Sequence, residues 1–259
     1  MNFNPGFDIS PTSHPMGFTY GSGVFGPEVE IRTLDAIRKS LLDPNCTGPD
    51  PVYAIAMDVG KIVHRPVLIE TNLLFGAVTY AAGQLGNEPV RSQGHIHIKV
   101  RTNSMSPPEI YEIWAGRAII YMQEFAGDYP GRCYAVEAGP GEAVVVPPDW
   151  SHATISANPD EPLTFGAWCD RNYGFDYDEV RAHHGLAWFP VFTNSHAISW
   201  KANHRYIPSK LIQKQPGVHP ELGLVPGVPI YTLFERNQDI FLYVSHPELK
   251  RDQWMYFEP

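Results

Sequence analysis

Short β-rich runs separated by turn residues dominate the middle of the chain, where the three-to-four-residue period of amphipathic helices is absent. Turn formers such as Asn72, Gly83, Gly116 and Pro140-Gly141 punctuate these runs. Strands this short and this regularly interrupted predict a closed or two-sheet all-β core. The runs rich in β-branched and aromatic residues lie at 52–57, 67–69, 75–80, 110–114, 118–122, 143–146 and 163–165.

The N-terminal part has a different pattern. Residues 1–26 are rich in Gly, Pro, Ser and aromatic residues without a clear period, which predicts an extended arm. From Glu28 to Leu42 apolar residues recur at roughly helical spacing, after Pro27 and before Pro44. Proline at the first turn and again just past the last one is typical of an amphipathic helix, so we predict a helix over this segment.

The C-terminal part is mixed, and residues 229–244 predict one or two helices, with a short one after Pro247. Because neither end carries a repeat or a charged linker, we expect the flanking segments to pack on the central core. The expected division is residues 1–50 as an N-terminal arm and helix, 51–179 as the barrel, and 180–259 as a C-terminal extension.

Composition narrows the class of protein. The formal net charge of −9 argues against binding to nucleic acid or to an anionic membrane surface. Three widely spaced cysteines without a CxxC motif predict neither a disulfide framework nor a zinc knuckle. The first residues have no basic segment followed by an apolar stretch, and no run reaches the ~18 apolar residues of a membrane span. We therefore expect a cytoplasmic enzyme.

Three histidines and a glutamate carry the candidate chemistry. His95 and His97 are two residues apart, so on a strand both imidazoles point to the same face. Glu109, and His152 in the run Pro147-Pro148-Asp149-Trp150-Ser151-His152, would complete a set of three nitrogens and one oxygen. Such a set suits one divalent ion per chain and leaves positions open for substrate. We expect Fe²⁺, with Zn²⁺, Mn²⁺ and Ni²⁺ as alternatives.

The carboxylate has two candidates, Glu109 and Glu112. An odd spacing of three residues places them on opposite faces of a strand, so only one can point inward. Six residues separate Glu109 from Gly116, which matches a known motif spacing, and we therefore prefer Glu109.

That spacing, with Gly141, Pro147, Asp149 and His152, resembles the two motifs of the cupin superfamily, G-x5-H-x-H-x3-4-E-x6-G and G-x5-P-x-G-x2-H. The resemblance covers roughly residues 75–177 and implies a double-stranded β-helix, a jelly-roll barrel. The chain departs from it at Pro89, Asp149 and Ser156, and has eleven residues between His97 and Glu109 where three or four are usual. The intervening hairpin must be longer.

A narrower resemblance is to the cupin-type glucose-6-phosphate isomerases of archaea and some bacteria. It is carried in chain order by residues 75–79, 92–97, 109–111, 146–152 and 174–177, and by the segment Ile31-Arg32-Thr33-Leu34. The resemblance implies an aldose–ketose isomerase of glycolysis and gluconeogenesis that acts on a phosphorylated hexose. It also implies a homodimer.

The same resemblance implies roles for single residues. Thr79, Ser92 and the Gly94 amide would hold the substrate phosphate, and Tyr111 would line the pocket. The family's Gly-His-Asp-Tyr becomes Gly174-Phe175-Asp176-Tyr177, so a histidine that could contact substrate is replaced by Phe175.

For the reaction, a metal-held sugar would exchange a proton between C2 and C1, with Glu109, His152 and Tyr111 as the catalytic set. A hydride shift is the alternative route. Other functions also stay open: an isomerase for another phosphosugar such as mannose 6-phosphate, an iron(II) cupin dioxygenase, or a sugar or metal sensor without enzymatic activity.

Overall fold

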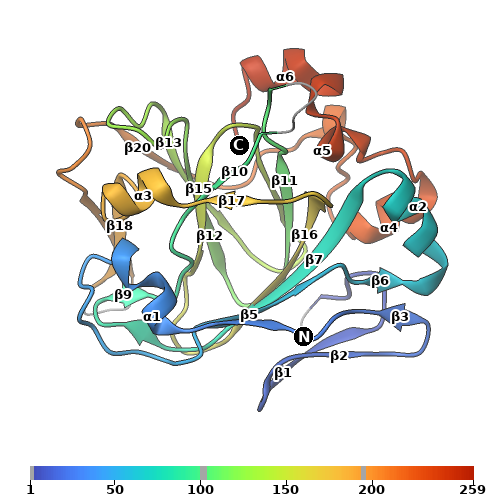
Figure 1. Cartoon of the computed structure of the whole chain (residues 1–259), viewed down its shortest axis with the longest axis horizontal. Helices are drawn as coiled ribbons and strands as arrows, with labels where there is room; N and C mark the ends of the chain where they lie inside the picture. The colour runs from blue at the N-terminus through green and yellow to red at the C-terminus, as the bar shows by residue number, and fades with distance from the viewer. Residues whose placement is uncertain (1–2, 100–103, 194–196) are drawn as a thin grey trace.

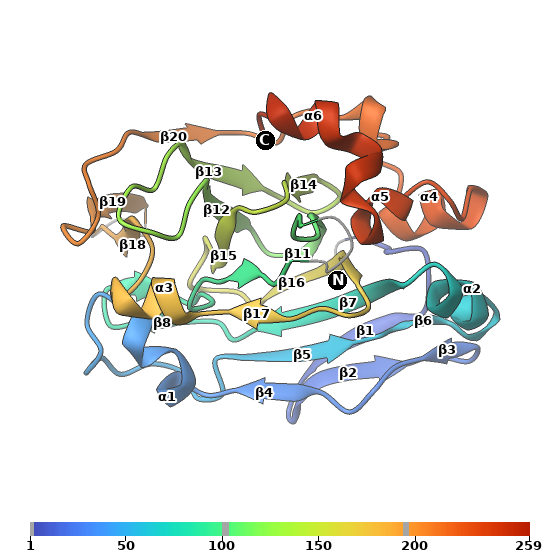
Figure 2. The same cartoon turned by 45° about the horizontal axis from the view of Figure 1, so that its top comes forward.

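A computed structural model describes residues 3–99, 104–193 and 197–259. Two sheets face each other and enclose the core (Figures 1 and 2). The larger contains β4 (Glu30–Arg32), β5 (Tyr53–Met57), β7 (Leu73–Tyr80), β11 (Glu109–Ala115), β14 (Ala143–Val146) and β16 (Leu163–Asp170), in the order β14-β11-β16-β7-β5-β4. The smaller contains β12 (Ala118–Gln123), β13 (Cys133–Ala138), β15 (Ser151–Ser156) and β20 (Leu211–Lys214), in the order β15-β12-β13-β20.

The core lies between the inner faces of these sheets. On β11 Tyr111 and Ile113 point inward, and they pack in one cluster with Ile120 of β12 and Phe165 of β16. The residues on either side of this pair on β11, Ile110 and Trp114, belong to a second cluster on the outer face. Alternation with a period of two therefore divides the strand residues between two apolar layers. The expected all-β jelly-roll barrel is confirmed.

Helices cover the outer face of the larger sheet. They are α4 (Ile230–Arg236), α5 (Leu242–Ser245) and α6 (Arg251–Met255), drawn in orange and red in Figure 2. Tyr231 of α4 stacks on Trp168 of β16 with ring centroids 5.6 Å apart, and Phe234 lies 4.8 Å from the same indole. Aromatic pairs at these distances bury large apolar areas and bind the C-terminal segment to the barrel.

The remaining elements are short. They are β1 (Ile9–Ser13), β2 (Met16–Tyr20), β3 (Val24–Phe25), β6 (Gly60–Lys61), β8 (Gln84–Leu85), β9 (Glu88–Pro89), β10 (Ile96–His97), β17 (Phe175–Asp176), β18 (Trp188–Phe192), β19 (Ile198–Ala202), α1 (Leu34–Ile37), α2 (Arg65–Glu70) and α3 (Asp178–Ala182). Within the described ranges no helix combines the length and apolar character needed to cross a bilayer.

Three local expectations are wrong or incomplete. The helix expected over residues 28–42 is instead β4 followed by the four-residue α1, because Glu30–Arg32 pairs with β5. The run 67–69 is helical, in α2, where Pro66 occupies the first turn. The expected runs omit β13 and β15, the second of which carries His152.

Both flanking segments extend the barrel's own sheets. β4 pairs antiparallel with β5, and β20 pairs parallel with β13. These pairings are compatible with one compact unit, and the division at residues 50 and 179 stays a prediction.

Glu112 is buried on the outer face of β11 with 1% of its surface exposed. Its carboxylate accepts hydrogen bonds from the Ile230 amide at 2.7 Å and the Trp114 indole at 3.0 Å. Burial, only partly opposed by these two bonds, raises the pKa of Glu112 to about 7. Glu112 therefore ties the start of α4 to the barrel and titrates well above an ordinary carboxyl.

A stability measurement tests this titration. Between its ordinary pKa of 4.5 and its folded value of about 7, the folded protein binds the Glu112 proton more strongly than the unfolded chain does. The free energy of unfolding should then fall as pH rises through this window, by about 3 kcal/mol from this group, and level off above it. In Glu112→Gln this contribution should vanish, so urea unfolding at a series of pH values should give the variant a flatter profile. Equal slopes for both proteins would contradict the assignment.

Candidate metal centre

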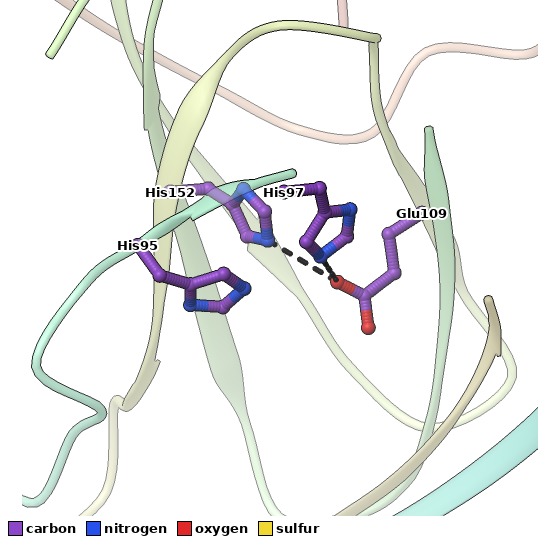
Figure 3. Close-up of side chains that lie close together, drawn as sticks. All are labelled: His95, His97, Glu109 and His152. Atoms are coloured by element: carbon purple, nitrogen blue, oxygen red, sulfur yellow. Dashed lines mark hydrogen bonds and ion pairs between the residues drawn. The ribbon is translucent and has the colours of Figure 1, made fainter. Parts of the chain in front are cut away.

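Four side chains from three strands and one loop position converge on one another (Figure 3). His97 lies on β10, Glu109 on β11 and His152 on β15, while His95 just precedes β10. The backbones of His95 and His152 exchange two hydrogen bonds, at 3.0 and 2.9 Å, which fix these residues opposite each other. One nitrogen or oxygen from each of the four side chains lies within 4.8 Å of all the others.

Backbone carbonyls determine which ring nitrogens face the cluster. The Nδ1 atom of His97 lies 3.0 Å from the Pro107 carbonyl, and that of His152 lies 3.1 Å from the Trp150 carbonyl. Because a carbonyl only accepts, both Nδ1 atoms carry hydrogen, and in a neutral ring Nε2 then holds the lone pair. Metal-binding histidines in proteins are oriented in this way, with one nitrogen anchored and the other free.

The Nε2 atoms point at a carboxylate. Those of His97 and His152 lie 3.3 and 3.2 Å from Oε2 of Glu109, as the dashed lines in Figure 3 mark. Burial alone would raise the pKa of Glu109, but its close contacts with the His152 and His97 imidazoles hold it well below its ordinary value. The carboxylate is therefore ionised. The Nε2 lone pairs of His97 and His152 would repel it at this distance, so protons or a cation must lie between them.

His95 supplies the third nitrogen. Its Nε2 is buried and has no hydrogen-bond partner among the described residues. Burial, and the charges that His152 and His97 would carry, lower the pKa of His95 well below its ordinary value, so the ring is neutral. A buried nitrogen without a partner is costly in a polar cluster and is explained by a ligand at that position. Three imidazoles that can bind in their neutral form, together with a carboxylate, could hold a divalent ion such as Fe²⁺ or Zn²⁺.

Two further groups hold Glu109. The Tyr111 hydroxyl donates to Oε2 at 2.7 Å, and the Cys169 thiol donates to Oε1 at 3.3 Å. Both oxygens of the carboxylate thus have fixed partners, and Tyr111 also lines the pocket. Cys169 was not predicted, although the alternation that places Phe165 inward on β16 also places Cys169 inward four residues later.

An aromatic pocket opens beside His95 and Glu109, which both line it. Phe175 of β17 packs edge-on against His95 with ring centroids 4.6 Å apart, and Tyr177 follows at 6.0 Å from the same imidazole. β17 is held there by its pairing with β10, in which Phe175 stands opposite His97. Where the resembling family has a histidine, the cluster here is therefore covered by an apolar ring.

The residues expected at the substrate phosphate lie in different places. Ser92 lines the pocket, and its hydroxyl accepts a hydrogen bond from the Thr154 amide at 3.1 Å. Gly94 has φ of +89°, and a Cβ there would lie 2.8 Å from the Leu186 side chain, so this turn requires glycine.

Thr79 does not reach the pocket. Its neighbours Val78 and Tyr80 line the pocket, whereas Thr79 hydrogen-bonds Thr164 at 3.1 Å on the opposite face of the sheet. Because side chains alternate along a strand, all three cannot face inward, and the expected contact of Thr79 with substrate is not supported.

The sequence pattern also missed Tyr53 of β5 and Arg32 of β4, which line the same pocket. The expected helix over 28–42 concealed Arg32, because only the pairing of β4 with β5 brings this residue to the barrel.

The family model and two relatives that match this chain carry the same description. The model of the family described as glucose-6-phosphate isomerase matches residues 42–208. The glucose-6-phosphate isomerase of Thermococcus litoralis is 31% identical over 111 residues, which cover 43% of this chain and 53% of that protein. That of Thermococcus kodakarensis is 30% identical over 161 residues, covering 60% of this chain and 77% of that protein. The chain thus spans about half the length of the first of these relatives.

Among solved structures, a recombinant oxalate oxidase in complex with glycolate has 18% sequence identity and a TM-score of 0.35, covering 48% of this chain and 54% of that chain. A variant of the Bacillus subtilis oxalate decarboxylase has 12% identity and a TM-score of 0.34, covering 58% of this chain and 31% of that chain. The family match to residues 42–208 is far more specific than these likenesses.

Proposed function

The chain belongs to the glucose-6-phosphate isomerase family, and from this premise we propose that it interconverts glucose 6-phosphate and fructose 6-phosphate with one divalent metal ion, Fe²⁺ by preference, per chain. The observation that carries the proposal is the set of Nε2 atoms turned toward an ionised Glu109, with His97 and His152 anchored through Nδ1. An isomerase of this kind needs a cation at the sugar's reacting end and no redox cofactor.

When bound, the metal would polarise the oxygens on C1 and C2 and make the hydrogen on the carbon next to the carbonyl, C2 of glucose 6-phosphate or C1 of fructose 6-phosphate, more acidic. The residues around it then have separate tasks. Glu109 lines the pocket and is ionised, so its carboxylate can take the proton from one carbon and return it to the other. Tyr111 and Cys169 hold its two oxygens in place for that transfer.

The aromatic wall supports the same chemistry. Phe175, Tyr177 and Tyr53 line the pocket, and their rings limit the water that reaches the reacting carbons. Phe175 cannot carry a proton, so the transfer depends on Glu109 more than it would if the family's histidine were present.

A coupled assay tests the activity. Metal-loaded protein given fructose 6-phosphate without oxygen should form glucose 6-phosphate, and mannose 6-phosphate given in its place tests the alternative substrate. A dioxygenase would instead consume oxygen and lose activity under anaerobic conditions. Absence of sugar-phosphate turnover in the metal-loaded protein would end the proposal.

Isotope labelling tests the role of Glu109 in moving the proton. Isomerisation in deuterated water should place solvent deuterium at C1 or C2, because a carboxylate that opens to the pocket exchanges its proton between transfers. Product free of deuterium would mean that hydrogen passes directly between the carbons as hydride, and that Glu109 only positions the site.

We further propose that the protein works in the cytoplasm, in glycolysis and gluconeogenesis, and as a homodimer, as the family resemblance implies. β4 lies at the edge of the six-stranded sheet, which offers one surface on which a second copy could pair. Sedimentation of the metal-loaded protein tests the dimer directly.

A further inference from the structure

Arg32 brings a positive charge to a pocket whose other charged walls are carboxylates and a histidine. Among the described residues that line this pocket, Arg32 is the only arginine or lysine, while Glu30 and Glu109 are the acids. It lies on β4, before the residues that match the family model, and it reaches the pocket because its strand pairs with β5.

Two tyrosines of the pocket wall are close enough to the guanidinium to feel its charge. Arg32 stands opposite Tyr53 in the β4–β5 register, and its charge opposes the larger effect of burial, which raises the pKa of the Tyr53 and Tyr177 hydroxyls. It also donates to Glu30 at 3.1 Å. These contacts orient a group with five N–H donors and leave donors free for a ligand.

The ion pair with Glu30 does not account for this placement. The Glu30 side chain is 53% exposed and Arg32 is 26% exposed, and pairs in such surroundings contribute little to stability. An exposed glutamate can also turn toward water when a stronger anion arrives. A phosphate offers a planar guanidinium two parallel hydrogen bonds, which is the geometry that favours arginine over lysine.

Tyr177 sets the separation between the two ends of the pocket. Its ring centroid lies 6.0 Å from that of His95 in the metal cluster, and its hydroxyl is near Arg32. The pocket therefore presents candidate metal ligands at one end and a guanidinium one tyrosine away. A substrate with an oxygen-rich carbon at one end and an anion at the other fits this polarity.

We infer that Arg32 binds the phosphate of the sugar substrate and takes the place in the pocket that Thr79 does not reach. The inference rests on the proposed function and deepens it: the phosphate end is held from the N-terminal strand β4, with Ser92 beside it. The selection of a phosphorylated sugar over a free sugar then depends on Arg32, the cation that lines the pocket.

Calorimetry with metal-stripped protein tests the inference independently of turnover, with fructose 6-phosphate, fructose and inorganic phosphate as probes. Arg32→Gln should weaken binding of fructose 6-phosphate and of phosphate roughly 10- to 100-fold, the range for hydrogen bonds to a charged group, and leave fructose unaffected. Arg32→Lys keeps the positive charge but loses the two parallel N–H donors, so its affinity for both probes should lie between those of the unmodified protein and Arg32→Gln. Lys39→Gln, which removes an exposed charge from the same segment, should match the unmodified protein.

Equal affinity of the unmodified protein and Arg32→Gln for fructose 6-phosphate would overturn the inference, as would no measurable phosphate binding by the unmodified protein. If phosphate binding depends on Arg32 and no hexose phosphate is turned over, the inference stands and the proposed function fails. If turnover is present and its KM is unchanged in Arg32→Gln, the proposed function stands and the inference fails.

Discussion

Replacing His152 by alanine should remove both the bound metal and the isomerase activity. His152 is 1% exposed, its Nδ1 is anchored by the Trp150 carbonyl, and its Nε2 is one of three nitrogens in the cluster. Loss even of a partner behind a metal ligand costs about 10- to 100-fold in affinity or activity, so loss of the ligand itself should cost more than about 100-fold. Metal content by mass spectrometry and the coupled assay measure the two effects.

Two companion variants make this result specific. His152→Gln keeps a side chain of similar size, so its loss of metal cannot be attributed to a cavity in the barrel. His204→Ala removes an exposed histidine outside the cluster and should leave metal content and turnover unchanged. Metal retained at full occupancy in both His152 variants would show that this residue is not a ligand.

Glu109→Gln and Glu112→Gln should have opposite consequences although the two glutamates are neighbours on one strand. Glu109 lies inside the barrel among His97, His152 and Tyr111, whereas Glu112 lies outside against Ile230. Glu109→Gln removes both a candidate metal ligand and the group that carries the proton, and with metal in excess kcat should fall by at least about 10²- to 10⁴-fold, the usual share of general acid–base catalysis. The loss should appear in kcat more than in KM.

Glu112→Gln should leave kcat unchanged and alter only the pH dependence of stability. The two variants are matched controls for each other, because each replaces a buried carboxylate by an amide and the two positions are only three residues apart on β11. A large loss of kcat in Glu112→Gln, or full activity in Glu109→Gln, would reverse the assignment of the inward carboxylate.

Strand alternation explains why much of the site could be predicted from sequence. His95 and His97 share a face because they are two residues apart, and Glu109 and Glu112 do not because they are three apart. The same rule separates Thr79 from Val78 and Tyr80, but only the structure shows that the face with Val78 and Tyr80 lines the pocket. The resemblance that implies a role for Thr79 does not fix the register of the strand.

Other features depend on contacts that no local pattern contains. Residues 28–42 have helical spacing, yet Arg32 lies in a strand. The reason is that Glu30–Arg32 forms backbone hydrogen bonds with the edge of β5. The apolar run 67–69 is too short for periodicity to separate helix from strand. Alternation can place Cys169 on the inner face, but its contact with Glu109 and the position of Tyr177 beside His95 follow only when β16 and β17 are placed in the barrel.

Titrating metal into stripped protein tests the central claim most directly, namely that the three histidines and Glu109 hold one catalytic cation. Isomerase activity should be absent without metal, rise linearly with added Fe²⁺ and reach its limit at one equivalent per chain. Full activity in protein shown to be free of metal, or a limit that His152→Ala reaches equally well, would contradict the account.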